Sequence, residues 1–274
     1  MVFASEKLFY TLIKEKIFIH FRNKLYICKN KGQLMLSKTK GVVLHSTKYS
    51  DTSWIVTMYT EMYGRTSFMV RGVTNKRSTT KVAFFQPLSV VDMDLFYNPA
   101  KEIHSIKDIR IDLPLTGIPF DPIKNAIALF ISELLFRSIK HSTPDENLFL
   151  FLCQSIEVLD CTQDVPANFH LIFMLKLTRF LGFEPHLNNE TGKYFDLING
   201  EFMSTIPLHA HYVANAQAEN LLRLDEIDYF SMIELTLSRT QRTEVLKTLI
   251  EYYRLHISGF HGLNSLAVLQ SIFD

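Results

Sequence analysis

The sequence predicts a small antiparallel β-barrel or sandwich followed by an all-helical domain. Residues 38–111 contain five short apolar segments separated by turns, and the apolar period lengthens from 2 to 3.6 residues after the Pro- and Gly-rich connector 113–122. A small curled sheet usually closes into a barrel or sandwich, and three or more packed helices form a core of their own. We therefore expect a β-domain at 35–114 and a helical domain at 115–274.

Alternation and turns define the strands. SWIVTMYT (53–60) and RTSFMVRG (65–72) flank the turn EMYG, and SVVDMDLFY (89–97) has the two-residue period of a half-buried strand. The spacing of isoleucines in KEIHSIKDIRI (101–111) changes between Ile106 and Ile109, which predicts a bulge or bend. Apolar side chains occupy both the odd and the even positions of 53–60, so Trp54 can face either side of the sheet.

Capping residues define the first helices. Asp121 and Pro122 begin one, and Thr143-Pro144-Asp145-Glu146 fits both a capping box and a first-turn proline for the next. A third begins at Pro166 and ends at Gly182.

The remainder is less regular. KYFDLINGEFM resembles a hairpin turned at Asn199-Gly200, inside an irregular insert near 186–203. A helix at 214–224 is followed by two or three more, around 228–238, 241–257 and 263–273.

Charge is distributed unevenly along the chain. Residues 38–112 hold eleven Lys or Arg against seven Asp or Glu, a net of +4, whereas residues 113–274 hold eleven against nineteen, a net of −8. The segment from Arg71 to Lys81 contains four cations and no acid. A basic β-domain on an acidic body indicates a polyanionic partner for the first part.

A basic barrel with exposed aromatic rings can bind single-stranded nucleic acid, because cations follow the phosphates and rings stack on bases. The alternative is that these charges only solvate a loop and the rings fill the barrel. The candidate stacking residues are Trp54, Tyr59 and Tyr63. The candidate cations are Lys38, Lys40, Arg65, Arg71, Lys76, Arg77 and Lys81.

Motifs of catalysis are absent. The chain has no GxxxxGK[ST], GxSxG or HExxH motif, and its ten histidines are scattered without ligands at metal spacing. We therefore expect no enzyme, no metal and no cofactor. Three cysteines, Cys28, Cys153 and Cys161, are too few for a disulfide framework and favour a reducing cytoplasm. No apolar run reaches the roughly 18 residues of a membrane span.

Lys176 interrupts an apolar helical stripe between Phe173 and Phe180, with Arg179 on the same helix. One interpretation is a lysine whose amine extends to water. The other is an apolar pocket with a cationic edge, which suits a peptide that ends in a hydrophobic residue and a free carboxylate.

Residues 1–34 do not share this design. They hold seven basic residues against two acids and offer no clear partner for their apolar side chains. We expect an upstream extension, from an over-long choice of start site. The alternative is a basic amphipathic helix that binds nucleic acid or a membrane surface.

The chain resembles the RecO family of bacterial recombination mediators from about Leu36 onward. The resemblance lies in the run GVVLHSTKYSDTSWIVTMYTEMYGRTSFMVRG (41–72), the Lys/Arg-Ser loop before Gln86-Pro87, ISELLFR (131–137) and FMLKLTRFLGFEP (173–185). It implies an OB-fold followed by a helical domain. It also implies a non-enzymatic role at the nucleoid.

That role comprises binding single- and double-stranded DNA, annealing complementary strands, and working with RecR to help load RecA on DNA coated by single-strand binding protein (SSB). By position, the resemblance carries DNA contact to Arg65, Arg71, Lys76, Arg77 and Lys81. It carries docking of the acidic SSB tail to Arg137, Lys176 and Arg179.

One departure from the family concerns zinc. Many members carry four cysteines after the segment that matches LGFEP, whereas residues 186–203 contain none. Packing and the hairpin itself must therefore hold this insert. Two other functions remain open: a protein-interaction scaffold without nucleic-acid binding, and an enzyme with an unrecognised site.

Overall fold

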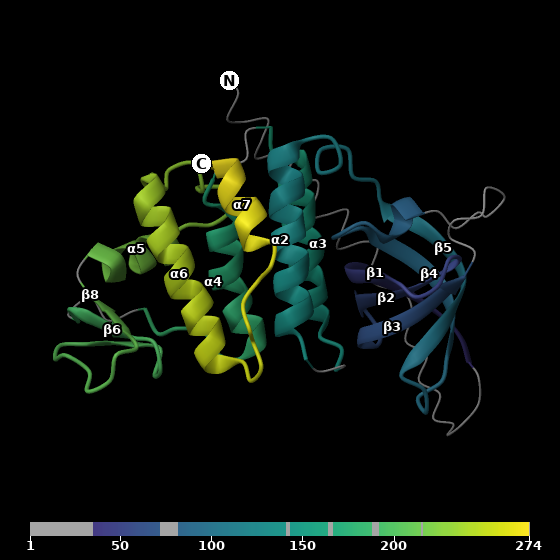
Figure 1. Ribbon diagram of the computed structural model, residues 1–274, viewed down its shortest axis with the longest axis horizontal. Coiled ribbons are helices and arrows are strands. Elements are labelled where there is room, and N and C mark those ends of the chain that lie inside the picture. The colour runs from purple at the N-terminus through teal and green to yellow at the C-terminus, as the bar shows by residue number, and fades with distance from the viewer. Residues whose placement is uncertain are drawn as a thin grey trace. The chain divides into compact units, whose positions relative to one another are not determined.

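The computed structural model describes residues 35–71, 82–140, 143–163, 167–187, 192–214 and 216–273. Within these ranges a closed five-stranded barrel precedes six helices and a small three-stranded sheet (Figure 1). The predicted barrel followed by a helical domain is confirmed. The barrel strands are β1 (Met35–Lys48), β2 (Ser53–Thr60), β3 (Gly64–Arg71), β4 (Val90–Tyr97) and β5 (Ile103–Leu113).

The barrel closes in the order β1-β2-β3-β5-β4, with β4 returning to β1. Its neighbours are antiparallel except β3 and β5, which pair in parallel over Ser67–Met69. This is the OB-fold arrangement that the resemblance implied. The predicted bulge is confirmed, because the register between β4 and β5 shifts where Asp94 and Leu95 meet Asp108 and Ile106. A short 3₁₀ helix, η1 (Val82–Phe85), was not predicted.

Alternate side chains of β2 pack into different cores. Val56 and Met58 join the barrel interior, whereas Tyr59 belongs to the core of the helical domain. Trp54 packs against the barrel interior with Val56, and its buried indole N–H has no hydrogen-bond partner among the described residues. The wall between the cores is thus apolar on both faces at Tyr59, whereas Ile55, on the same side of β2, belongs to neither core.

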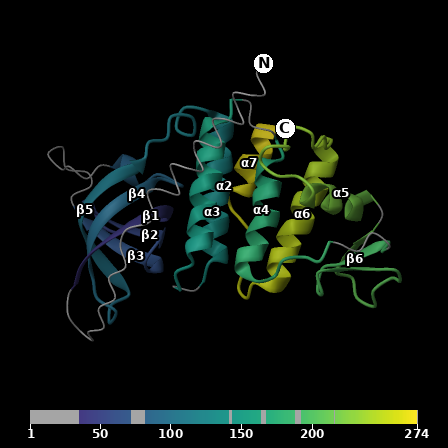
Figure 2. The same ribbon diagram turned by 180° about the vertical axis from the view of Figure 1, so that it is seen from behind.

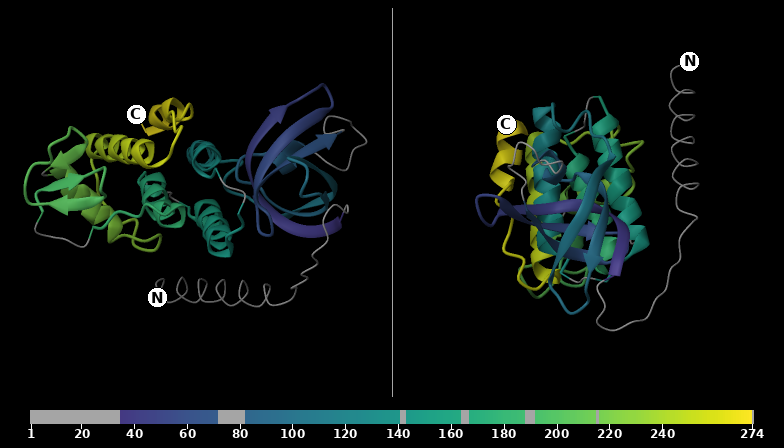
Figure 3. Two further views of the ribbon diagram at one scale, coloured as in Figure 1. Left: turned by 90° about the horizontal axis from the view of Figure 1, so that it is seen from below. Right: turned by 90° about the vertical axis from the view of Figure 1, so that its right-hand side faces the viewer.

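The helices are α2 (Pro122–Ser138), α3 (Glu146–Cys161), α4 (Phe169–Leu181), α5 (Ala216–Asp225), α6 (Arg239–His256) and α7 (Leu266–Phe273). Figures 2 and 3 show α2 and α3 next to the barrel and α4 alongside them on the side away from the barrel.

Polar contacts join the barrel to α2 and α3. The Arg65 guanidinium donates hydrogen bonds to the carbonyls of Phe136 and Ile139 at the end of α2, and lies 4.6 Å above the Phe136 ring. The Asp145 N–H donates to the Tyr59 hydroxyl over 2.9 Å. These contacts satisfy groups at helix ends that would otherwise be unpaired.

Local capping sets two helix ends as predicted. The Asp121 carboxylate accepts from the N–H groups of Ile123 and Lys124 and begins α2 at Pro122. Gly182 ends α4 in the left-handed conformation, with φ of 82°.

Two helix predictions are wrong. Asp145, not Thr143, caps α3, because its carboxylate reaches the N–H groups of Asn147 and Leu148. Residues 228–238 form no helix, because the Asp228 side chain accepts from the N–H groups of Phe230 and Ser231 and closes a turn. The predicted start of the third helix at Pro166 lies outside the described residues, and α4 begins at Phe169.

The small sheet has the order β7-β6-β8, with β6 (Tyr194–Asp196), β7 (Glu201–Met203) and β8 (Tyr212–Ala214). The predicted hairpin is β6 and β7, whereas β8 was missed. The Asp196 side chain, 1% exposed, accepts from the N–H groups of Ile198 and Asn199, from the Asn199 amide and from His209 Nε2. The His211 N–H donates to His209 Nδ1, so Nε2 carries the proton of a neutral His209.

The first prediction tests the junction. Arg65→Ala should lower the free energy of unfolding by about 2–4 kcal/mol, because it removes charge-assisted hydrogen bonds and leaves two helix-end carbonyls unpaired. Arg71→Ala, on the same strand but exposed, should change it by less than about 0.5 kcal/mol. Urea denaturation measures both variants, and an equal effect would contradict the junction role.

The second prediction concerns Asp196. Burial opposes its ionisation, but the hydrogen bonds from Ile198, Asn199 and His209 hold its pKa below the ordinary 3.8. Asp196→Asn should cost about 2–3 kcal/mol at pH 7. A lowered pKa stabilises above the unfolded value, so the wild-type advantage should shrink as the pH falls from about 4 through the folded pKa. Denaturation between pH 7 and 3 measures it, with exposed Glu219→Gln as control. A constant difference would exclude the ionised carboxylate as the cause.

Candidate nucleic-acid interface

One outer face of the barrel carries paired charges. Asp92 on β4 accepts from Lys38 at 3.2 Å and from Arg110 at 2.6 Å, and Lys40 lies 2.9 Å from Asp112. Burial opposes the ionisation of Asp92, but hydrogen bonds from Arg110 and Lys38 hold its pKa below the ordinary range. We call this the charged face. Its residues are Lys38, Lys40, Asp92, Asp94, Asp108, Arg110 and Asp112.

A second outer face has no Lys, Arg, Asp or Glu among its eight residues. Val56, Met58 and Phe68 fill the barrel, so the residues alternating with them point outward. The hydroxyls of Thr57 and Ser67 lie 3.1 Å apart across β2 and β3, which confirms this orientation. We call this the uncharged face. It comprises His45, Thr47, Ile55, Thr57, Ser67, Met69, Ile103 and Ser105, which the strand registers bring together.

Arg71 lies at the edge of the uncharged face. It follows Met69 by two residues at the end of β3, so it starts on the same side of the strand. Its side chain is exposed and makes no hydrogen bond or ion pair with the other residues that the structure describes. The other loop cations, Lys76, Arg77 and Lys81, lie outside the described residues.

Three predicted DNA contacts are engaged within the protein. Arg65 binds α2 and is only partly exposed, which argues against a role in DNA contact. Lys38 and Lys40 pair with carboxylates of the charged face, so a phosphate would have to displace Asp92 or Asp112. Both acids follow their partners by more than 50 residues, so no local pattern reveals the pairing.

The predicted stacking residues do not lie on the uncharged face. Trp54 closes the barrel interior and Tyr59 faces the helices. The ring of Tyr63 stacks on Tyr97 at 3.8 Å, which in turn stacks on His104 at 4.6 Å. Rings at all three positions therefore support the fold.

Lys176 lies beside an aromatic cluster on α3 and α4. Phe151 stacks on Phe173 at 5.2 Å and on Phe180 at 4.7 Å, and Lys176 lies between these two along α4. Arg179 is exposed one turn later. Acids are also near, since burial raises the pKa of Asp225 and the charge of Lys176 opposes that rise.

Arg137 makes its contacts elsewhere. It forms a 2.8 Å ion pair with Glu133, whose carboxylate also accepts from the N–H groups of Asn264 and Ser265 before α7. Among the described residues no hydrogen bond or ion pair joins Arg137 to Lys176 or Arg179. The structure therefore links Lys176 with Arg179 along one helix and does not link either to Arg137.

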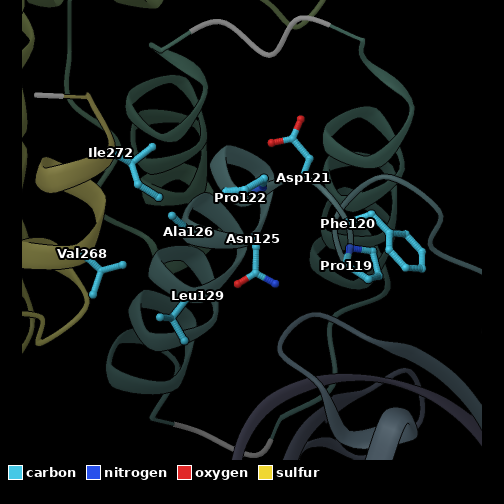
Figure 4. Close-up of a pocket in the computed structure, with 9 residues that line it drawn as sticks. All are labelled: Pro119, Phe120, Asp121, Pro122, Asn125, Ala126, Leu129, Val268 and Ile272. Atoms are coloured by element: carbon cyan, nitrogen blue, oxygen red, sulfur yellow. The ribbon is translucent and has the colours of Figure 1, made fainter.

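An apolar groove of about 250 Å³ lies between the first turns of α2 and helix α7 (Figure 4). Leu129 forms its floor, Val268 and Ile272 form one wall, and Phe120, 83% exposed, stands at the other. Asp121 is the charged residue of its lining, so the groove offers no cation to an acidic peptide.

Neither a metal centre nor a membrane span emerges from the described ranges. No three His, Cys, Asp or Glu residues there lie close enough to hold a metal ion. No helix there is both long and apolar enough to cross a bilayer.

Comparison with known proteins assigns the family. The sequence model described as "Recombination protein O N terminal" matches residues 35–112, and that described as "Recombination protein O C terminal" matches 119–267. The chain belongs to the RecO family. It is 44% identical to the DNA repair protein RecO of Bacteroides fragilis, over 88% of this chain and the whole of that relative. Identity is 38% to RecO of Phocaeicola vulgatus and 29% to RecO of Porphyromonas gingivalis, with the same coverage.

RecO membership identifies a function in DNA repair and recombination. The prediction of this family from the segments 41–72, 131–137 and 173–185 is confirmed. The uncharged face was missed. The alternation of side chains within β2 and β3 predicts that Ile55 and Met69 point outward. The parallel pairing that brings Ile103 beside Ser67 has no local signal in the sequence.

Proposed function

We propose that this chain binds single- and double-stranded DNA through its barrel, anneals complementary strands and, with RecR, helps load RecA on SSB-coated DNA. It acts as a mediator without catalysing a reaction, at the nucleoid. RecO membership supports the general role. The observation that carries DNA binding is Arg71, an exposed cation where the acid-free basic segment begins.

The mechanism is neutralisation of phosphate charge. Two strands that approach each other repel through their backbones, and Lys and Arg side chains lower that repulsion while releasing counterions. Arg71 with Lys76, Arg77 and Lys81 supplies four positive charges within eleven residues. Lys38, Lys40 and Arg65 are left out of this set, because each is engaged within the protein.

Docking of the SSB tail is assigned to Lys176 and Arg179. A peptide with a hydrophobic last residue could place that side chain against Phe151 and Phe180 and its carboxylate near Lys176. Arg137 contributes only if a ligand displaces Glu133.

The third prediction tests the basic segment. Arg71→Ala with Arg77→Ala should weaken binding of a fluorescent strand of about 30 nucleotides and flatten the slope of log affinity against log salt by about 1.4, since each lost phosphate contact removes about 0.7. Lys247→Ala with Arg254→Ala removes the same charge from α6 and should leave the slope unchanged. Fluorescence anisotropy at several salt concentrations measures both. Unchanged binding by the first double variant would discard this site.

The fourth prediction tests tail docking. Lys176→Glu should weaken binding of an acidic peptide with a hydrophobic C-terminal residue by about tenfold or more, because it reverses the charge beside the aromatic cluster. Binding to DNA should persist. Lys247→Glu, an equal charge change at an exposed site on α6, is the control. Equal peptide affinity for Lys176→Glu and wild type would remove this assignment.

A scaffold without nucleic-acid affinity is the competing function. The wild-type titration separates the two, because a DNA-binding barrel loses affinity steeply with salt and a scaffold shows none at low salt. Annealing with and without SSB is then the direct test of the mediator role.

A further inference from the structure

We infer that two copies of this chain associate around a twofold axis, with the Phe120 ring of each copy seated in the apolar groove between α2 and α7 of the other. The inference is independent of the proposed DNA binding, because it concerns a surface of the helical domain alone. Its consequence for the proposed function is that one particle carries two barrels.

The first argument is that a ring and a groove lie side by side and do not fill each other. Leu129 on α2 and Val268 on α7 are exposed where they line the groove. Phe120 is 83% exposed, and its ring points away from Leu129 and Val268 (Figure 4). Apolar side chains that gather on a surface in this way mark a site of interaction.

The second argument is shape. An apolar cavity of about 150 Å³ holds a benzene molecule, so the groove of about 250 Å³ has room for a phenyl ring. In a twofold dimer the same surface serves both partners, and each contact occurs twice. A surface that carries both a projecting ring and an apolar groove can therefore match a second copy of itself.

The third argument is charge. Asp121 is the charged residue of the groove lining, and it accepts hydrogen bonds at the N-terminus of α2, where the helix dipole favours a negative charge. Helix α7 has no Lys, Arg, Asp or Glu within Leu266–Phe273. Lys124, near the start of α2, is buried and donates to the Asp160 carbonyl over 2.7 Å. A second copy therefore approaches with few charges to desolvate, whereas an acidic peptide finds no cation.

The fourth argument is area, which predicts a reversible dimer. An aromatic side chain buries about 150–250 Å² when it is enclosed, so two Phe120 rings with the groove surface that covers them remove roughly 600–800 Å² from water. With the exposed Pro119, Pro122 and Ile123 around them, the total approaches about 1,000 Å². Specific stable interfaces bury about 1,200–2,000 Å², so this contact lies at the weak end and should form at micromolar concentrations.

The contact leaves the junction of barrel and helices undisturbed. The barrel meets α2 at its C-terminal half, through Ser132, Phe136 and Ile139, whereas the groove lies at its N-terminal half. The dimer therefore needs none of the residues that join the barrel to α2. If each barrel holds a strand as proposed, a dimer brings two strands together.

The experiment is sedimentation velocity of the full chain without DNA, at about 1–100 μM, where a dimer that obeys mass action changes its population. Phe120→Ser should weaken dimerisation by about a hundredfold, since a twofold contact loses two rings and each is worth about tenfold. Leu208→Ser, at a fully exposed position on the loop before β8, is the control and should dimerise like the wild type. Urea denaturation should show that both variants fold normally, because both side chains are exposed.

A mixture of two variants tests the reciprocal contact. Val268→Glu places a charge in the groove and keeps the ring, whereas Phe120→Ser loses the ring and keeps the groove. Each variant alone should dimerise poorly. Mixed, the two retain one of the two contacts, so the heterodimer should form about tenfold more tightly than either variant with itself.

A wild-type chain that stays monomeric at about 100 μM would overturn the inference and leave the groove to a partner of another sequence. Dimerisation of Phe120→Ser equal to that of the wild type would overturn it too, as would a mixture that associates no more tightly than its components. A wild-type chain that dimerises but binds no DNA at low salt would instead refute the proposed function alone.

Discussion

The arrangement of this molecule depends on one barrel wall that is apolar on both of its faces. Val43, Val56 and Met58 point into the barrel, whereas Val42 and Leu44 point into the core of the helices. If the two domains separate, the outer apolar face of this wall and the helical surface packed against it are exposed to water, so barrel and helices stabilise each other. The helices cover this side of the barrel. The charged and uncharged faces lie on the outer surface that remains.

This constraint gives two arginines of one strand opposite roles. Arg65 meets the helical domain, where a partly buried guanidinium requires acceptors and finds the carbonyls at the end of α2. Arg71 lies beyond that contact and remains exposed. The two arginines have the same side-chain chemistry. Their positions along β3 relative to the helices therefore decide which of them is accessible to a ligand. The same reasoning separates Lys176, beside an aromatic cluster, from Arg137, which Glu133 already binds.

Features set by near neighbours were predictable from the sequence. The Asp121 cap, the Gly182 end of α4 and the alternation of β4 each depend on residues within one turn or one strand. Features set by distant partners were not. The pairing of Lys40 with Asp112 joins strands 72 residues apart, and the parallel contact of β3 with β5 has no signature in either strand. Among the predicted cations, Lys38, Lys40 and Arg65 have partners within the protein that the sequence does not reveal, since it gives charges but not their partners.

The proposed annealing of strands would depend on cations whose charge the protein itself leaves available. Two strands that pair bring their phosphate backbones together, and each cation that meets a phosphate lowers their repulsion. Lys38 and Lys40 already lie against Asp92 and Asp112, so a phosphate would have to displace a carboxylate to reach them. The side chain of Arg71 is exposed at the end of β3, where the acid-free segment begins, so it can meet a phosphate without displacing a carboxylate of the described residues. The separation of paired from exposed cations on one barrel therefore favours contact with a strand at the end of β3.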